Sequence, residues 1–352
     1  MIELFSDVAA LPPDARALLA AAEREDFQLG PAWLATVAAE ALPAGARPAL
    51  LLWREAGTPA VLLALQRGMD RKFAGLASPY TSRFRPAVAA GTTDAALRRA
   101  GAAFGRACRR GVLRLDALEA EWPGWPPLLA GFRRAGLLPL RFAHFGSWEL
   151  DLGGMDWQGY LASRPGELRE TIRRRLARAE RDTSVGFALV DGAGGLAEAV
   201  AAYDAVYAKS WKPPEPFPGF GPAMLRAAAA AGVLRLGVLR RAGEPVAAQY
   251  WTVSDGAATL HKLAHDEAAR ALSPGTVLTA LMLRRLIGQE RVRRIDLGRG
   301  DDAYKAGWTG TRRQRIGVLL CPPWRPIGLA ALARHGLGRL AAVFANAQDG
   351  KA

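Results

Sequence analysis

Residues 239–247 read Leu239-Arg240-Arg241-Ala242-Gly243-Glu244-Pro245-Val246-Ala247, which is the end of an apolar strand, an Ala-Gly-x-Pro turn and the start of a second apolar strand. Residues 53–61 in the first half of the chain repeat this pattern as Trp-Arg-Glu-Ala-Gly-Thr-Pro-Ala-Val. A short turn with glycine between two apolar runs predicts a β-hairpin. We therefore expect one hairpin in each half of the chain.

Two further matches occur in the same order along the chain. Residues 30–34, Gly-Pro-Ala-Trp-Leu, precede the first hairpin, and residues 221–225, Gly-Pro-Ala-Met-Leu, precede the second. A weaker match pairs residues 113–116 with residues 294–297. Three matches in one order favour an internal duplication, and 352 residues suit two domains. We predict an N-terminal domain at 1–147, a second domain at 148–325, and an amphipathic C-terminal helix and tail at 326–352.

The second half predicts a mixed α/β domain. Its apolar periodicity indicates a helix at 195–211, then strands at 233–239, 246–253 and 258–265, a helix at 275–287 and a strand at 293–297. A helix between the last two strands predicts a parallel crossover. The expected fold class is therefore α/β with a mixed sheet, built as two tandem domains of which the second is the better defined.

Several classes of protein are disfavoured by composition. The two cysteines, Cys108 and Cys321, are far apart and have no Cys/His cluster around them, so we expect reduced thiols and no metal site. Residues 1–7 are acidic and do not resemble an export signal. No apolar run approaches the roughly 18 residues of a membrane span. We expect a cytoplasmic protein.

The net charge of +14 is mostly arginine. It favours an anionic partner, such as nucleic acid, anionic lipid, an acidic glycan or a phosphorylated cofactor, although an arginine-rich codon bias would produce the same excess. Much of it falls at residues 167–178, where Leu168, Ile172 and Leu176 form a narrow apolar stripe and arginines cover the other faces. This segment is either a solvated helix or a clamp for phosphate or an anionic acceptor.

Two loops carry groups suited to chemistry. After the third predicted strand, Ser273-Pro274-Gly275 begins a helix whose free amides, with Arg270 nearby, are suited to bind phosphate. After the last core strand, residues 296–308 combine aspartates, a tyrosine, a lysine and a tryptophan. Loops at the carboxyl ends of parallel strands bind ligands in open α/β sheets, although a polar surface loop has the same composition.

Residues 157–308 resemble the GNAT acetyltransferase domain of CelD-like bacterial proteins. This domain is related to the FemABX peptidoglycan aminoacyl transferases, which also contain two GNAT halves. The matching residues are Trp157-x-x-Tyr160, the arginines of 169–178, Ser210-Trp211-Lys212, Gly243-x-Pro245-Val246-Ala247, His265-Asp266-Glu267, Ser273-Pro274-Gly275, residues 296–301 and Tyr304-Lys305-x-x-Trp308.

The resemblance implies two tandem GNAT-like domains, an acyl-CoA donor and an amine or hydroxyl acceptor. The usual pyrophosphate loop of the family is Gln/Arg-x-x-Gly-x-Gly/Ala, whereas residues 270–275 read Arg-Ala-Leu-Ser-Pro-Gly. The first half has no comparable loop, because residues 80–91 contain Arg85-Pro86 and no Ser-Pro-Gly. We expect this half to be a degenerate domain that shapes the acceptor cleft.

The site residues follow from this interpretation. Direct transfer needs a base, an acid and donors for the oxyanion. Tyr304 matches the position of the family's tyrosine acid, and Asp266 or Glu267 is the expected base. Lys305 would hold the oxyanion or a substrate carboxylate, and Asp302 would orient the amine. The expected cofactor-binding residues are Ala264, His265, Arg270, Ala271, Leu272, Ser273, Pro274, Gly275 and Thr276, and the expected substrate-binding residues are Arg173, Trp211, Tyr250, His261, Lys262 and Trp308.

Three alternatives stay open at this point. His261 is either a second candidate base or a hydrogen-bonded strand histidine. The net charge and the FemABX likeness allow a transferase that uses aminoacyl-tRNA. The arginine-rich helix and the C-terminal segment allow a non-catalytic module for an anionic glycan or a membrane surface.

Overall fold

The computed structural model describes residues 1–70 and 72–335, which form two compact units. Of the predicted C-terminal helix, residues 326–335 are helical, and the rest of that prediction lies outside the described residues. Of the described residues, the first unit contains 1–20, 42–70, 72–144 and 314–335, and the second contains 21–41 and 145–313. This division differs from the predicted domains, because residues 21–41 pack with the second half of the chain and residues 314–325 pack with the first half.

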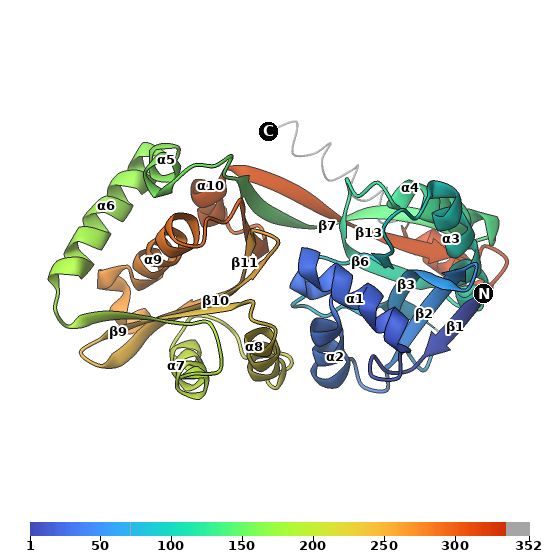
Figure 1. Cartoon of the computed structure of the whole chain (residues 1–352), viewed down its shortest axis with the longest axis horizontal. Helices are drawn as coiled ribbons and strands as arrows, with labels where there is room; N and C mark the ends of the chain where they lie inside the picture. Colours follow the sequence, from blue (N-terminus) through green and yellow to red (C-terminus); the bar gives the residue numbers. More distant parts are fainter. Residues whose placement is uncertain (71, 336–352) are drawn as a thin grey trace. The chain divides into compact units, whose positions relative to one another are not determined.

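The first unit is a sheet with two helices packed against each other and a third helix nearer the N-terminus (Figure 1). Its strand order is β1-β2-β3-β4-β6-β13, with β5 also paired to β3. The strands are β1 Ile2–Phe5, β2 Arg47–Glu55, β3 Thr58–Arg67, β4 Phe73–Gly75, β5 Ala87–Val88, β6 Leu113–Glu119 and β13 Thr311–Cys321, and the helices are α1 Pro13–Glu25, α3 Asp94–Cys108 and α4 Trp125–Arg134.

The second unit is a sheet with helices on both faces. Its strand order is β7-β12-β11-β10-β9-β8. Figure 1 shows α6 and α9 on one face of this sheet and α7 and α8 on the other. The strands are β7 Leu138–Asp151, β8 Val185–Val190, β9 Leu234–Arg241, β10 Glu244–Ser254, β11 Ala257–His265 and β12 Arg294–Arg299. The helices are η1 Phe27–Leu29, α2 Pro31–Glu40, α5 Trp157–Ala162, α6 Gly166–Arg181, α7 Leu196–Ala208, α8 Phe220–Ala230, η2 Glu267–Leu272, α9 Pro274–Gly288 and α10 Ala303–Thr309.

The two halves of the sequence exchange segments. The last part of β7, which follows the first half, pairs antiparallel with β12 in the second unit. The last part of β13, which follows the second half, pairs antiparallel with β6 in the first unit. Helix α2 packs on α8 in the second unit although it precedes the first hairpin in sequence. The sequence repeat therefore does not coincide with the compact units.

Both predicted hairpins are present and have the same turn. In β2–β3 the turn residues Ala56 and Gly57 have φ of 46° and 86°, and in β9–β10 Ala242 and Gly243 have φ of 49° and 86°. Two successive left-handed residues are typical of the two-residue turns that match the twist of paired strands. Glycine supplies the second of these conformations without a Cβ penalty. The predicted parallel crossover is also present, since β11 and β12 run parallel.

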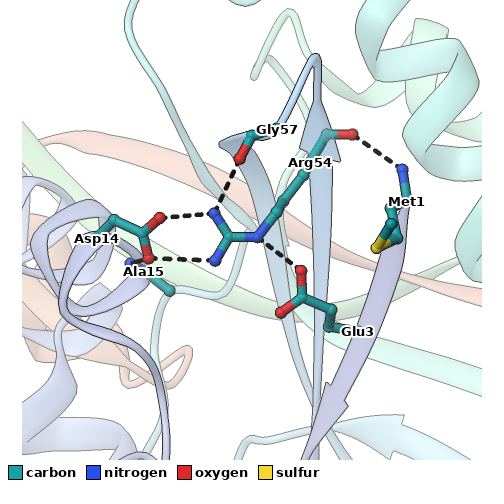
Figure 2. A network of polar contacts seen from close by, with 6 residues as sticks. All are labelled: Met1, Glu3, Asp14, Ala15, Arg54 and Gly57. Carbon is teal, nitrogen blue, oxygen red and sulfur yellow. Dashed lines mark hydrogen bonds and ion pairs between the residues drawn. The ribbon is translucent and has the colours of Figure 1, made fainter.

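An ion-pair network joins three elements of the first unit (Figure 2). The Arg54 guanidinium, on β2, donates from Nε to Glu3 Oε1 at 2.6 Å and from Nη1 to Asp14 Oδ2 at 2.6 Å. It also donates to the carbonyl of Gly57 in the hairpin turn at 3.1 Å, and the amino group of Met1 donates to the Arg54 carbonyl. Arg54 thereby holds β1, α1 and the β2–β3 turn together.

The core of the second unit lies mainly between the sheet and α5, α6 and α9. Trp251, Leu278 and Leu283 are fully buried there. Residues of β10 alternate across the sheet, so Trp251 faces α9 while Tyr250 faces α7, where its ring lies 5.2 Å from that of Tyr203. None of the helices in the described part of the chain is long and apolar enough to cross a membrane.

Candidate active site

The candidate site lies where two neighbouring strands of the second unit separate. β11 and β12 pair at only three positions, residues 257–259 with 294–296, although β11 continues to His265 and β12 to Arg299. A cavity of about 800 Å³ lies beside this divergence and is lined by the end of β11, the start of α9, α10 and the first turns of α6. This volume falls within the range of small-molecule sites, roughly 300–1,000 Å³.

The chain is bent locally on both strands. Gly298 has a φ of +67°, and a Cβ built on it would lie 2.2 Å from the Leu260 carbonyl oxygen, so this position needs glycine. The buried Asp296 carboxylate fixes the bend by accepting hydrogen bonds from Gly298 N at 2.7 Å and Ser147 Oγ at 2.9 Å. On β11, a bulge opposite Tyr250 and Trp251 leaves His261 without a partner in the register. Bulges of this kind redirect side chains beside active sites.

The start of α9 presents free backbone amides. Ser273, the residue before the helix, has a φ of +52° and its side chain does not cap the helix. Pro274 lacks an amide proton, and no described residue accepts from the amides of Gly275 and Thr276. Both residues line the cavity. A Cβ on Gly275 would lie 3.2 Å from His265 Cδ2, so the strand end and the helix start are in close contact. These amides and the helix dipole form an anion site.

A tyrosine and a lysine of α10 form the opposite wall. The Tyr304 side chain is 51% exposed, and partial desolvation of its hydroxyl, with the Asp302 carboxylate as the smaller cause, raises the pKa of Tyr304 to about 12. The hydroxyl is therefore protonated at neutral pH. Lys305 is 4% exposed and donates to the Arg299 carbonyl oxygen at 2.8 Å, and its Nζ lies 3.4 Å from Asp302 Oδ2. Burial lowers the pKa of Lys305, while the Asp302 charge opposes this change.

The wall on the α7 side is aromatic and basic. The Trp211 ring lies 4.5 Å from the His265 ring, and Lys262 Nζ lies 2.6 Å from Glu215 Oε1. His261 lines the cavity, and its Nε2 lies 2.9 Å from Thr252 Oγ1. Burial lowers the pKa of His261 to about 4, which leaves the ring neutral at pH 7. His261 is thus a hydrogen-bonded strand histidine that also faces the cavity.

The structure brings most, but not all, of the predicted site residues together. Those that line the cavity are Tyr304, Lys305, Asp302, His265, Arg270, Ser273, Pro274, Gly275, Thr276, Trp211, His261, Lys262 and Trp308. Those that do not line it are Asp266, Glu267, Ala264, Ala271, Leu272, Arg173 and Tyr250.

Local contacts explain why these seven residues do not line the cavity. The Asp266 carboxylate caps η2 by accepting from Ala268 N at 2.8 Å, and Glu267 is exposed, so the base that we predicted at these positions is not at the cavity. Ala264 is fully buried, and the Ala271 carbonyl accepts from Arg175 Nη1 at 3.0 Å. Leu272 ends η2 outside the lining. Arg173 is on the exposed face of α6, and Tyr250 is buried behind His261, with the two rings stacked at 6.0 Å.

The sequence did not predict several other residues that lie at the cavity or next to it. Lys212 and Arg299 belong to segments that carry the family resemblance, residues 210–212 and 296–301, but no role in the site was predicted for either residue. Leu168 and Thr171 place the first turns of α6 at the cavity. Trp33 of α2 lies 5.6 Å from the His261 ring and 5.4 Å from the Phe220 ring. Only the tertiary packing of α2 on the second unit brings Trp33 to this position.

The corresponding position in the first unit is closed. β4 and β6 also pair in parallel, but Phe84 continues the ladder by donating its amide to the Ala117 carbonyl at 2.9 Å. Its ring occupies the space beside Gly75, where an added Cβ would lie 3.0 Å away. The start of α3 is capped, because Thr93 Oγ1 accepts from Ala96 N at 3.2 Å. The first unit therefore has neither the open strand pair nor the free amides of the second.

Comparison with protein families matches most of the second unit to a known domain. Residues 166–306 match the family model described as the acetyltransferase (GNAT) domain. This match includes α6, the divergent strands, the start of α9 and most of α10. No curated protein matches the chain in sequence.

Solved structures extend the likeness to most of the chain. FemX is similar with a TM-score of 0.54 and 10% identity over 81% of this chain and 94% of that one. A tandem GNAT protein from the clavulanic acid biosynthesis pathway has a TM-score of 0.51 and 14% identity, over 91% of this chain and 98% of that one. The C-terminal domain of a proposed lysylphosphatidylglycerol synthetase from Agrobacterium fabrum has a TM-score of 0.52 and 15% identity, over 81% of this chain and 87% of that one. At these identities the likeness establishes the fold. Residues 166–306 thus match the acetyltransferase (GNAT) domain family, and the fold of the chain resembles that of a tandem GNAT protein.

Proposed function

We propose that the protein is a cytoplasmic N-acyltransferase that uses acyl-CoA and transfers the acyl group to an amine of a small molecule or a cell-envelope or polysaccharide precursor. The observation that carries the proposal is the uncapped start of α9, whose free amides at Gly275 and Thr276 line the same cavity as the Tyr304 hydroxyl. An anion-binding helix start and a proton donor in one cavity fit a donor that has a diphosphate at one end and a thioester at the other.

The donor would lie along the divergence of the two strands. Arg270 lines the cavity beside the amides and adds a positive charge for the diphosphate. From there the pantetheine arm would run between the ends of β11 and β12 towards α10. Closure of the equivalent position in the first unit by Phe84 supports donor binding in the second unit.

The transfer step forms one bond and breaks one. The acceptor nitrogen attacks the thioester carbonyl, the C–N bond forms and the C–S bond breaks. Tyr304 donates its proton to the sulfur as the C–S bond breaks, so that the donor's sulfur leaves as the thiol. Solvent then returns a proton to Tyr304.

The acceptor must lose a proton to become nucleophilic. Lys212, Lys262 and Lys305 surround the cavity, and nearby positive charge lowers the pKa of an ammonium group. The neutral His261 ring lines the same wall and is the candidate to take the proton, directly or through water. These two effects replace the base that we expected at Asp266 or Glu267.

The test is calorimetric titration of the full chain with CoA, followed by thiol release from acetyl-CoA in the presence of amine acceptors. We expect CoA to bind with a stoichiometry of one per chain, since only the second unit has the free amides. Failure of CoA to bind would remove the proposal.

A second candidate is transfer of an aminoacyl group from tRNA. The fold likeness to FemX and to the proposed lysylphosphatidylglycerol synthetase favours it, as does the charge of +14. Thermal stabilisation by charged tRNA but not by CoA would select this candidate. Salt-sensitive binding to anionic vesicles or polysaccharide without binding of either donor would instead indicate a non-catalytic module.

A further inference from the structure

Three lysines line the cavity, and they differ in their partners. Lys262 Nζ pairs with Glu215 at 2.6 Å, and Lys305 Nζ pairs with Asp302 at 3.4 Å. Among residues 1–70 and 72–335, no carboxylate lies within ion-pair distance of Lys212 Nζ. Its ammonium group lies 5.5 Å from the centre of the Trp211 ring instead. Lys212 is therefore a cavity cation without a counter-ion in the described chain.

The position of Lys212 is fixed by its neighbours. It follows α7, and the preceding residue, Trp211, packs against His265 at the end of β11. Its backbone amide donates to Ser210 Oγ at 3.4 Å. Lys262 lies on the same wall, with its Nζ 5.9 Å from the centre of the Tyr207 ring. The charges that act on Lys212 are those of Lys262, Glu215, Asp302 and Lys305, and the last two flank Tyr304. Lys212 therefore faces the side of the cavity where the transfer step would occur, and it is available to the acceptor.

The environment of Lys212 is costly for an isolated cation. Burial is the main effect that lowers its pKa, the Lys262 charge adds to it, and Asp302 and Glu215 oppose it from beyond ion-pair distance. An anion bound beside Nζ would offset this cost. Lys212 and the groups that act on it comprise three lysines, Lys212, Lys262 and Lys305, and two carboxylates, Glu215 and Asp302. One positive charge therefore remains, which matches a monoanion better than a dianionic phosphate.

We infer that the acceptor is an amine that also carries a carboxylate, and that Lys212 is the specificity-determining residue that binds this carboxylate. The inference rests on the proposed acyl-CoA function. Lys305 cannot take this role as we predicted from sequence, because Asp302 and the Arg299 carbonyl already occupy its ammonium group.

The test uses bisubstrate analogues, which need no turnover. CoA is linked through its sulfur and an acetyl spacer to the nitrogen of glycine, β-alanine or γ-aminobutyrate. Each analogue has a neutral twin with a carboxamide, and an aminomethylphosphonate analogue represents phosphate. Dissociation constants are measured by calorimetry for CoA and every analogue. The proteins are the wild type, Lys212→Met and the control Lys209→Met, which removes an exposed lysine outside the cavity at the end of α7.

We expect at least one carboxylate analogue to bind the wild type about tenfold more tightly than its carboxamide twin, as for a charge-assisted hydrogen bond. Lys212→Met should abolish this preference and leave the dissociation constant of CoA unchanged. Lys209→Met should keep both the preference for carboxylate and the binding of CoA.

Three outcomes would overturn the inference while CoA still binds. The wild type could bind each carboxylate analogue and its carboxamide twin equally, the preference for carboxylate could survive Lys212→Met, or the protein could prefer the phosphonate alone. If CoA itself does not bind, the proposed function fails first, and the two failures are thereby distinguished.

Discussion

At the scale of single residues, Tyr304 is the position on which the transfer step depends. Its raised pKa of about 12 keeps the phenol protonated across the neutral range, so it can donate throughout that range. Tyr304→Phe should lower kcat by about 100-fold, the lower end of the effect of a general acid, and leave the Kd for CoA nearly unchanged. Thiol release under saturating acetyl-CoA measures the rate. Tyr80→Phe, in the first unit, is the control. An unchanged kcat would exclude Tyr304 from proton transfer.

Asp14 makes a prediction about pH and stability. Its hydrogen bonds to Arg54 lower the pKa of the carboxyl below the ordinary value of 3.8. A lowered pKa in the folded state stabilises the protein above the unfolded pKa, and this stabilisation disappears as the pH falls through the folded value. Asp14→Asn should therefore lower the free energy of unfolding at pH 7, and the difference should shrink below about pH 4. Urea titrations at both pH values measure it, and a difference that grows in acid would contradict the network of Figure 2.

At the scale of elements, the start of α9 carries the donor site. Ser273→Asp would place a carboxylate beside the free amides, where the helix dipole favours negative charge. We expect a more stable fold together with loss of CoA binding, because the new charge competes with the diphosphate. Ser273→Asn is the matched control, since asparagine also tolerates the left-handed conformation but has no charge. Retention of CoA binding by Ser273→Asp would show that the diphosphate is not bound at these amides.

The pair α3 and α4 offers a stability test away from the site. A Cβ on Gly101 would lie 2.2 Å from the Leu128 carbonyl oxygen, so the two helices approach through glycine. Gly101→Ala should cost about 1–3 kcal/mol of stability, as overpacking usually does. Gly221→Ala, at the start of α8 with no atom within 4 Å of the added Cβ, should be neutral or slightly stabilising. Chemical denaturation of both variants tests the contrast, which would fail if the two changed stability alike.

At the scale of the whole molecule, the exchanged segments predict that the halves depend on each other. A chain cut between residues 147 and 148 leaves the second piece without α2 and the first without the last part of β13. Neither piece should fold alone, and the two should fold when co-expressed. A cut after Gly194, in the loop between β8 and α7, is the control. Size-exclusion chromatography and circular dichroism report the outcome, and a stable monomeric 148–352 piece would contradict the prediction.

The sequence predicted the local features of this molecule better than the exchanges between its halves. The hairpins, the parallel crossover and the start of α9 were predictable because turn glycines, apolar periodicity and Ser-Pro-Gly act over a few residues. Asp266 was misassigned as a base because a carboxylate near a strand end can face the site or cap the next turn, and only the backbone geometry decides. Trp33 could not be found, because its position arises from packing between segments that are remote in sequence. Lys212 belongs to the Ser210-Trp211-Lys212 match, but only the structure shows that its side chain lines the cavity.

The strand and helix exchange has a consequence for how such a chain can change over generations. Helix α2, from the first half of the sequence, supports the His261 wall, and β13, from the second half, completes the first sheet. A change that disrupts α2 therefore also disturbs the unit that holds the cavity. Removal of the first half of the chain would therefore also remove a support of the cavity, so the two halves have to be kept together for the cavity to persist.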